Sequence, residues 1–197
     1  MVGRKKYVTV KEIAEYLQVT KQTISNWINS GKLKADRLPS GRIRVLLSDF
    51  LSFLIKNNLH VDKKFFGLKV TKVVVIDDDE SVLQVLKTFF LSTFPDCNVE
   101  YMNDPIEGLL KIGEVRPDVV ILDIKMERMN GIDVCRRILE NENLSNMKII
   151  VISGYIDEYK DELDKLNIYG RLSKPFRYSE LENLLRPIIF DARLINS

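Results

Sequence analysis

The sequence predicts two domains of different class: a small, mainly α-helical domain, followed by an α/β domain with a doubly wound parallel sheet. The first observation is the charge: residues 1–66 carry thirteen Lys and Arg against five Asp and Glu, and residues 67–197 carry seventeen against twenty-three. The second is the hydrophobic pattern, which changes from helical spacing to short apolar strands alternating with amphipathic helices. We therefore expect a first domain over 1–56, a linker over 57–68 and a second domain over 69–197.

The composition excludes several classes of protein. With 45% hydrophobic residues the chain is not disordered, and its apolar runs are far shorter than the ~20 residues that cross a membrane. No signal-peptide pattern is found, so we expect a cytoplasmic protein without a membrane partner. Cys97 and Cys135 lie among apolar residues without a CxxC pair, which favours buried free thiols. The one histidine, His60, has no partner for metal or nucleophilic chemistry.

Two short helices joined by a turn are predicted near the start of the chain. Thr9-Val10-Lys11-Glu12 has the form of a capping box, which predicts that a helix begins there. A second cap, Thr20, precedes a helix with Ile24, Trp27 and Ile28 on one face. This pattern is typical of a helix-turn-helix, whose second helix can enter the major groove of DNA. The outward-facing residues of that helix are candidate DNA contacts: Lys21, Gln22, Ser25, Asn26 and Asn29.

A hairpin and a third helix are predicted to follow. Extended stretches over 33–38 and 42–47 flank a Pro39-Ser40-Gly41 turn. Arg42 and Arg44 are two residues apart, so we expect both on one side of the strand, where guanidinium groups can reach a phosphate or the minor groove. Ser48 is predicted to cap the third helix.

Residues 9–55 resemble the winged helix-turn-helix domain of the MerR and excisionase type. The resemblance rests on the stretches 19–28 and 31–33, and on the order of turn, hairpin and third helix. It implies binding to double-stranded DNA. One such domain covers little DNA, so we expect a homodimer on paired half-sites. The residues leave open a small basic domain that binds protein or only solvates its charge.

Strands and helices alternate from residue 70 onward. The apolar runs 73–76, 119–122 and 149–152 predict strands buried on both faces of a parallel sheet, and less apolar strands fit at 98–101 and 169–173. The predicted helices span 81–93, 105–113, 132–140, 157–166 and 179–189. In such a sheet, ligands bind beyond the carboxyl ends of the strands.

Polar residues follow four of these strands. Asp77-Asp78-Asp79 come after the first strand, Asp123 after the third, Ser153 after the fourth and Lys174 after the fifth. Since the carboxyl ends of parallel strands share one edge, we expect these side chains to meet. Clustered carboxylates repel one another unless a hard cation joins them, which favours Mg²⁺. An ammonium and a hydroxyl group opposite suit a phosphoryl group, although each residue alone could be an ordinary solvated side chain at the surface.

Residues 69–185 resemble the receiver domain of two-component response regulators. The motifs that carry the resemblance lie at 74–81, 122–126, 129–131, 151–155 and 172–176. They imply a flavodoxin-like (βα)5 fold with sheet order 2-1-3-4-5 and a cis peptide bond between Lys174 and Pro175. They also imply that Asp123 accepts a phosphoryl group from a sensor histidine kinase or phosphotransfer protein, with Ser153 and Lys174 beside it. The implied Mg²⁺ ligands are Asp77, Asp78, Asp123 and the backbone carbonyl of Lys125.

Two residues depart from the receiver pattern. Glu127 stands where the family usually has proline. Arg171, three residues before Lys174, stands at the switch position, where the family usually has an aromatic residue that turns inward when the domain is phosphorylated. An arginine cannot be buried without a paired anion, so an output independent of phosphorylation stays open. The order of the domains is also unusual, since DNA-binding response regulators mostly carry the receiver first.

We therefore expect a DNA-binding response regulator that controls transcription and is not an enzyme beyond self-phosphorylation and self-dephosphorylation. The alternative is an excisionase-like architectural factor that bends DNA, gated by its receiver. A Mg²⁺-dependent phosphohydrolase fits less well, because the sequence has no Gly-rich phosphate loop. The apolar stretch 188–195 predicts either an extended last helix or a packing tail.

Overall fold

The structure, a computed structural model, describes residues 6–190 except 58, 63–64 and 145. The contacts divide the chain into two compact units, which separate between Lys69 and Val70. Within the described ranges, no helix has both the length and the apolar character needed to cross a membrane.

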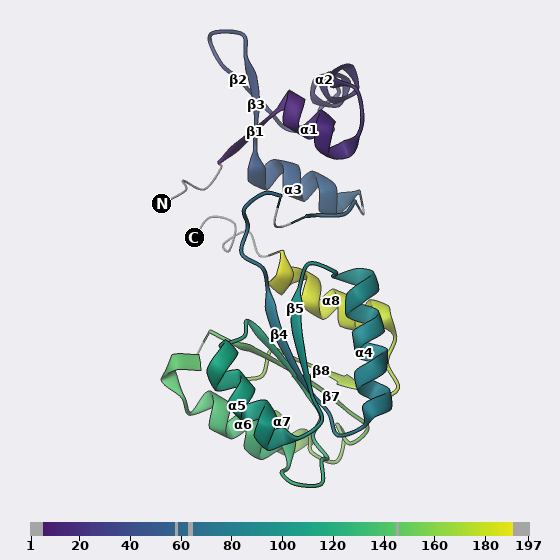
Figure 1. The fold of residues 1–197 in the computed structure, drawn as a ribbon, viewed down its shortest axis with the longest axis vertical. Helices are drawn as coiled ribbons and strands as arrows, with labels where there is room; N and C mark the ends of the chain where they lie inside the picture. Colours follow the sequence, from purple (N-terminus) through teal and green to yellow (C-terminus); the bar gives the residue numbers. More distant parts are fainter. Residues whose placement is uncertain (1–5, 58, 63–64, 145, 191–197) are drawn as a thin grey trace. The chain divides into compact units, whose positions relative to one another are not determined.

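The first unit combines three helices with a three-stranded antiparallel sheet (Figure 1). Its elements are β1 (Tyr7–Thr9), α1 (Val10–Leu17), α2 (Lys21–Asn29), β2 (Asp36–Arg37), β3 (Ile43–Leu46) and α3 (Leu47–Lys56). The sheet order is β1-β3-β2, so β3 pairs on both sides. Val8 and Val45 are partners across the sheet and are both buried, which places one face of the sheet against the core.

Both helices of the predicted helix-turn-helix begin at their predicted caps. The Thr9 hydroxyl accepts a hydrogen bond from the Glu12 amide at 3.2 Å, and the Glu12 carboxylate accepts one from the Thr9 amide at 2.8 Å. The Thr20 hydroxyl accepts a hydrogen bond from the Thr23 amide at 3.1 Å. Each cap satisfies a helix N–H that would otherwise lack a partner, so local sequence determines these two boundaries.

The prediction that Ser48 caps the third helix is wrong. Helix α3 begins at Leu47, directly after β3, and Ser48 lies inside its first turn. The Leu47 amide donates to the carbonyl of Lys6 at 3.0 Å, just before β1. The first turn of α3 is therefore bonded to the backbone of the segment just before β1 and not to a side-chain hydroxyl. The sequence did not predict β1, because a three-residue strand is too short to show an alternating pattern.

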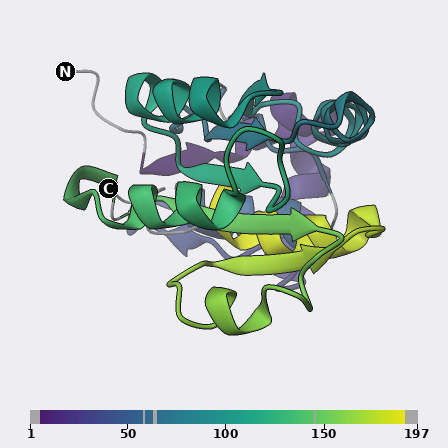
Figure 2. The same ribbon diagram turned by 90° about the horizontal axis from the view of Figure 1, so that it is seen from below.

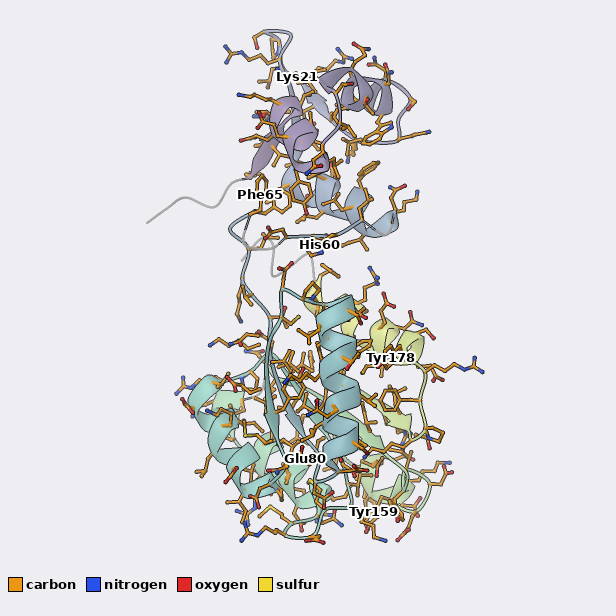
Figure 3. All side chains as sticks on the ribbon, turned by 45° about the vertical axis from the view of Figure 1, so that its right-hand side comes forward. Lys21, His60, Phe65, Glu80, Tyr159 and Tyr178 are labelled. Atoms are coloured by element: carbon orange, nitrogen blue, oxygen red, sulfur yellow. The ribbon has the colours of Figure 1, made fainter. Side chains whose placement is uncertain are left out.

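Part of the predicted linker packs onto the first unit. The Tyr16 hydroxyl donates to the carbonyl of His60 at 2.8 Å and accepts from the amide of Asp62 at 2.9 Å. The rings of Tyr16 and Phe66 lie 4.9 Å apart, and Phe66 and Val61 are buried. His60 and Phe65 mark this segment in Figure 3. Tyr16 therefore makes the segment after α3 part of the first unit's packing.

The second unit is a five-stranded parallel sheet between helices. Its elements are β4 (Lys72–Ile76), α4 (Glu80–Thr93), β5 (Asn98–Met102), α5 (Pro105–Val115), β6 (Val119–Leu122), α6 (Gly131–Leu139), a short 3₁₀ turn (Glu142–Leu144), β7 (Lys148–Ser153), α7 (Lys160–Leu163), β8 (Gly170–Ser173) and α8 (Tyr178–Ile189). The strand order β5-β4-β6-β7-β8 is the predicted 2-1-3-4-5 order. The doubly wound flavodoxin-like fold is confirmed.

Two apolar clusters fill the two faces of this sheet. Val73 and Val75 pack with residues of α4 and α8, and Val74 and Ile76 pack with residues of α5 and α6. Figures 1 and 2 show helices on both sides of the strands. Burial on both faces explains why the central strands are continuous apolar runs rather than alternating ones.

Three expectations for this unit need adjustment. The helix predicted over 157–166 is only the four-residue α7, and Ser153 is the last residue of β7 rather than the first residue after it. Cys135 is buried, and burial raises the pKa of its thiol to about 12, but Cys97 is only half-buried. Of the apolar stretch 188–195, Ile188 and Ile189 end α8, and 191–195 lie outside the described residues.

Candidate functional site

Three carboxylates meet at the carboxyl edge of the parallel sheet. Asp77 and Asp78 follow β4, and Asp123 follows the adjacent strand β6. One oxygen from each lies within 4.8 Å of the others. Asp77 is 2% exposed and Asp123 is 8% exposed, whereas Asp78 is more exposed than either. The strand register therefore brings together the three aspartates that the sequence predicts as one acidic site.

Lys174 supplies the positive charge of this site. Its Nζ donates to Asp77 Oδ2 at 2.7 Å and to Asp123 Oδ2 at 3.0 Å. The residue follows β8, and its peptide bond to Pro175 is cis, as predicted. The ammonium thus bridges two carboxylates that lie 46 residues apart in sequence.

The electrostatics of the bridge follow from burial and charge. Burial raises the pKa of the Asp77 carboxyl, and the hydrogen bond from Lys174 opposes this rise only in part. Burial acts to lower the pKa of Lys174, but the two carboxylates outweigh it and raise that pKa above its ordinary value. The site therefore holds a cation between two carboxyl groups, and burial makes Asp77 a weaker acid than a free aspartate.

Backbone amides hold one further oxygen of each carboxylate. Asp123 Oδ1 accepts from the amide of Ile124 at 2.7 Å, and Asp77 Oδ1 accepts from the amide of Asp79 at 3.1 Å. Asp78 Oδ2 accepts from the amide of Glu127 at 3.0 Å. The sequence marks Glu127 only as a departure from proline; in the structure its N–H, which proline lacks, orients a carboxylate of the site.

Ser153 ends β7, the strand next to β6, and Lys125 lies two residues after Asp123. Ser153 is fully buried at the end of β7, and its hydroxyl accepts from the Tyr155 amide at 3.4 Å. The Lys125 side chain is exposed, with its Nζ 4.1 Å from the centre of the Tyr155 ring. Sequence reasoning missed Tyr155 as a neighbour of the site, because the Lys125–Tyr155 contact joins two different loops.

Close packing explains one residue of the 129–131 motif. A Cβ on Gly131 would lie 2.0 Å from the Asp123 carbonyl oxygen, closer than atoms can approach. The Gly131 amide also donates to the Ile124 carbonyl at 2.7 Å. The N-terminus of α6 therefore fits against the Asp123 loop only with glycine at this position.

An ion pair that the sequence did not indicate joins two loops at this edge of the sheet. Asp104 caps α5 by accepting from the amides of Ile106 and Glu107, and it also binds Arg128 at 2.8 Å. The hydrogen bond from Arg128 is the main cause that lowers the pKa of Asp104. No spacing rule connects a helix cap with a loop residue 24 positions away.

Arg171, the predicted switch residue, lies on the surface of β8. Its Nη2 is 2.8 Å from Asp164 Oδ1, and both side chains are partly exposed. The anion that an arginine requires is thus present, but at the surface and not in the core.

On the first unit, helix α2 presents the predicted polar face. Lys21, Gln22, Asn26 and Asn29 are exposed, whereas Ser25 is half-buried and its hydroxyl donates to the Lys21 carbonyl at 3.0 Å. Gln22 donates to Asn26 at 3.0 Å. Figure 3 labels Lys21 at the first residue of this helix.

The two predicted arginines of the hairpin differ in their surroundings. Arg42 is exposed and precedes β3, in which Arg44 lies. The Arg44 guanidinium stacks 3.8 Å from the Tyr7 ring centre, and its Nε is 3.8 Å from Asp36 Oδ2. A third arginine, Arg37, donates to Asn29 Oδ1 at 2.8 Å. Sequence reasoning missed Arg37, because nothing in the sequence shows that β2 reaches α2.

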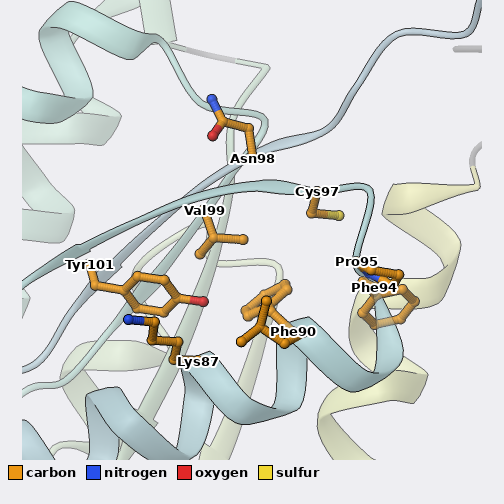
Figure 4. Close-up of a pocket in the computed structure, with 9 residues that line it drawn as sticks. Lys87, Phe90, Phe94, Pro95, Cys97, Asn98, Val99 and Tyr101 are labelled. Atoms are coloured by element: carbon orange, nitrogen blue, oxygen red, sulfur yellow. The ribbon is translucent and has the colours of Figure 1, made fainter. Parts of the chain in front are cut away.

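A separate hollow of about 260 Å³ lies between α4 and the amino end of β5 (Figure 4). Its lining is mostly apolar and comprises Lys87, Phe90, Leu91, Phe94, Pro95, Cys97, Asn98, Val99 and Tyr101. Burial raises the pKa of Tyr101 to about 12. The hollow is at the opposite end of the strand from the acidic site and contributes nothing to it.

Comparison with known families agrees with this architecture. Residues 73–186, more than half of the chain, match the response regulator receiver domain family. The chain belongs to the response regulator receiver domain family. Residues 7–58 match a helix-turn-helix domain, so the receiver domain is fused to an N-terminal helix-turn-helix.

Relatives and solved structures match the receiver domain. Response regulator MprA of Mycobacterium leprae (strain TN) is 28% identical over 118 residues, which cover 60% of this chain and 50% of that protein. Response regulator MprA of Mycobacterium sp. (strain KMS) is 30% identical with the same coverage. The chain thus spans about half the length of the curated relatives it matches.

Two crystal structures show the same fold. Chemotaxis protein CheY4 of Vibrio cholerae has a TM-score of 0.55 and 26% identity, covering 61% of this chain and 99% of that one. The signal receiver domain of a DNA binding response regulator protein (merR) from Colwellia psychrerythraea 34H has a TM-score of 0.58 and 25% identity, covering 60% and 98%. Both likenesses are to the receiver domain.

Proposed function

We propose that the protein is a DNA-binding response regulator whose receiver domain accepts a phosphoryl group on Asp123 and thereby controls DNA binding and transcription. The observation that carries the proposal is the Lys174 ammonium within 3.0 Å of both Asp77 and Asp123 at the carboxyl edge of the sheet. The donor would be a sensor histidine kinase or a phosphotransfer protein. Apart from forming and losing this phosphoryl bond, the chain would not act as an enzyme.

In the proposed transfer, an Asp123 carboxylate oxygen attacks phosphorus and forms an acyl phosphate. The bond from phosphorus to the donor histidine nitrogen breaks, and that nitrogen keeps the electron pair and takes up a proton. Lys174 neutralises the charge of the transferred oxygens, and the hydroxyl of Ser153 donates to one of them. The Ile124 amide holds Oδ1 of Asp123, so the attacking oxygen would be Oδ2, which faces the Lys174 ammonium.

The acidic cluster fits a hard divalent cation. Three carboxylates converge within 4.8 Å, and oxygen is the ligand type that Mg²⁺ prefers. Asp77, Asp78, Asp123 and the backbone carbonyl of Lys125 would hold the ion. When bound, Mg²⁺ would offset the negative charge of the phosphoryl oxygens.

Labelling by a small phosphodonor such as acetyl phosphate tests this part of the proposal. The wild-type chain should gain the mass of one phosphoryl group in the presence of Mg²⁺, and Asp123→Asn should gain none while remaining folded, as circular dichroism would show. Asp133→Asn is the matched control, since Asp133 is an exposed carboxylate on α6 that binds Arg136. Labelling of Asp123→Asn equal to the wild type would refute the assignment.

The first unit would bind double-stranded DNA through α2 and the hairpin. Of the predicted contacts, Lys21, Gln22, Asn26 and Arg42 are exposed and supply donors for phosphates and base edges. Ser25, Asn29 and Arg44 already have partners within the unit, so their proposed roles are to support these contacts. A homodimer would place two such surfaces on paired half-sites.

Selection from random-sequence duplexes by the full chain tests the DNA-binding part. Enrichment of one motif with two copies at fixed spacing would support both specific binding and the homodimer. If the full chain retained no duplex even at low salt, the proposed DNA binding would be overturned. Lys21→Gln should reduce the salt dependence of binding, because one phosphate contact is lost.

A second candidate is a receiver whose output does not depend on phosphorylation. The observation that favours it is the Arg171–Asp164 ion pair on the surface of β8, where an aromatic residue would have no such partner. Equal DNA affinity of the wild type with and without acetyl phosphate would support this candidate. A change in affinity that Asp123→Asn abolishes would exclude it.

A further inference from the structure

We propose that Arg37 on the hairpin binds a DNA phosphate beside α2, and that Asn29 is the positioning residue that orients its guanidinium. The inference rests on the proposed DNA-binding function and deepens it. Its starting point is the hydrogen bond of 2.8 Å from Arg37 Nη2 to Asn29 Oδ1, which joins the hairpin to the polar end of α2.

The strand register determines which side of the sheet each arginine occupies. Arg37 is paired with Ile43, and Val45, two residues further along β3, is buried. Residues two apart in a strand share a face, so Arg37 and Ile43 lie on the same face as the core residue Val45. Arg37 therefore emerges on the side of the sheet where the helices pack, next to α2.

Arg44 lies on the opposite face of the same sheet. It is paired with Asp36 and with Thr9, and Tyr7, two residues before Thr9, lies on the same face. Its guanidinium stacks on Tyr7, and its Nε is buried. Arg44 thus fills the outer face of the sheet and holds β1 to the hairpin, which leaves Arg37 as the arginine directed toward α2.

The Arg37–Asn29 contact extends a row of polar side chains along α2. Gln22 and Asn26 are hydrogen-bonded at 3.0 Å and are four residues apart, and Asn29 follows three residues later. Residues at these spacings occupy one face of a helix. Arg37 adds a positive charge at the end of this row.

A guanidinium group held in this way is suited to a phosphate. It carries five N–H donors in a plane, and the bond to Asn29 Oδ1 uses Nη2. The remaining donors keep the fork geometry that matches phosphate oxygens. Because Asn29 fixes the plane of the fork, less side-chain freedom is lost on binding.

The test measures affinity of the full chain for its selected duplex over a range of salt concentrations. Arg37→Gln should weaken binding roughly tenfold and lower the slope of log K against log salt by about 0.9, the value for one phosphate contact. Arg136→Gln, the same substitution at an exposed arginine of the receiver helix α6, should leave the slope unchanged. Melting temperatures of the variants show whether each one folds.

Asn29→Ala separates positioning from direct contact. It should weaken binding roughly threefold with an unchanged salt slope, because the charge of Arg37 remains. In combination with Arg37→Gln, it should weaken binding no further than Arg37→Gln alone. Arg37→Lys should keep the slope and recover only part of the affinity. These results together would support the inference.

Other outcomes would overturn it. Additive effects of Asn29→Ala and Arg37→Gln would mean that Asn29 contacts DNA by itself, and an unchanged slope in Arg37→Gln would mean that Arg37 binds no phosphate. In either case DNA binding by the wild type would leave the proposed function standing. A wild-type chain that binds no duplex at low salt would overturn both.

Discussion

The two units of this protein hold their candidate functional groups in opposite ways. In the receiver, Asp77, Asp123 and Ser153 are each less than a tenth exposed, and they come from the ends of three different strands. In the helix-turn-helix unit, most of the polar groups are exposed, and they come from one helix and one hairpin. The first arrangement suits chemistry on a small group, and the second suits contact with a large polyanion.

This difference has an energetic consequence. A buried charge is stable only while its partners are in place, so the receiver site is coupled to the stability of the fold. An exposed polar group exchanges its partners with water at little cost, so the polar surface of α2 is not coupled to the stability of the fold. Substitutions in the receiver should therefore change both stability and chemistry, and substitutions on α2 should change binding alone.

The largest effect on stability is expected from Gly131→Ala. The new Cβ would lie 2.0 Å from the Asp123 carbonyl oxygen, so either α6 or the Asp123 loop must move. We expect a loss of about 3 kcal/mol in the free energy of unfolding, measured by urea denaturation. Gly113→Ala is the matched control, because a Cβ there meets nothing within 4 Å, and alanine in the helix α5 should be neutral or stabilising. Equal stability of the two variants would contradict the prediction.

A smaller loss is expected from Lys174→Met. It leaves Asp77 and Asp123 close together without a cation, which should lower the free energy of unfolding by about 2 kcal/mol at neutral pH. Millimolar Mg²⁺ should restore part of this loss if the carboxylates bind the ion, as thermal unfolding with and without EDTA would show. Lys165→Met, which removes an exposed lysine, should change neither quantity. A variant as stable as the wild type would show that the bridge is not coupled to folding.

Within the first unit, Thr9→Ala should have the next largest effect. It removes the hydroxyl that accepts from the Glu12 amide, and such caps contribute about 1 kcal/mol. Thr9→Ser keeps the hydroxyl and should keep most of the stability. The measurement is thermal unfolding followed by circular dichroism. If alanine and serine were equivalent, the capping box would not be what starts α1.

The smallest effect on stability is expected from Gln22→Ala, which breaks an exposed hydrogen bond between two side chains of α2. The melting temperature should stay unchanged, because alanine favours the helix and water replaces the lost partner. Binding to the selected duplex should nevertheless weaken, since a donor to a base edge is lost. A fall in melting temperature as large as that of Thr9→Ala would show that the two units do not differ in the proposed way.

Much of the receiver could be predicted from local sequence, for a physical reason. Parallel strands buried on both faces require continuous apolar runs, and the order of the strands sends the residues after each run to one edge. Asp77, Asp123 and Lys174 therefore converge in the structure as their positions in the sequence predict. The caps at Thr9 and Thr20 are equally local, since each needs only a hydroxyl near the first turn of a helix.

The contacts that the sequence does not predict join elements that have no pattern of their own. The three-residue β1 exists because β3 pairs with it, and Lys6 beside it replaces the expected cap at Ser48. Phe66, which the sequence places in the linker, packs against Tyr16 of the first unit. Spacing alone placed Arg42 and Arg44 together, but the register puts Arg44 beside Tyr7 and directs Arg37 to α2. Sequence periodicity assigns a residue to a face, and only the packed sheet determines what that face contacts.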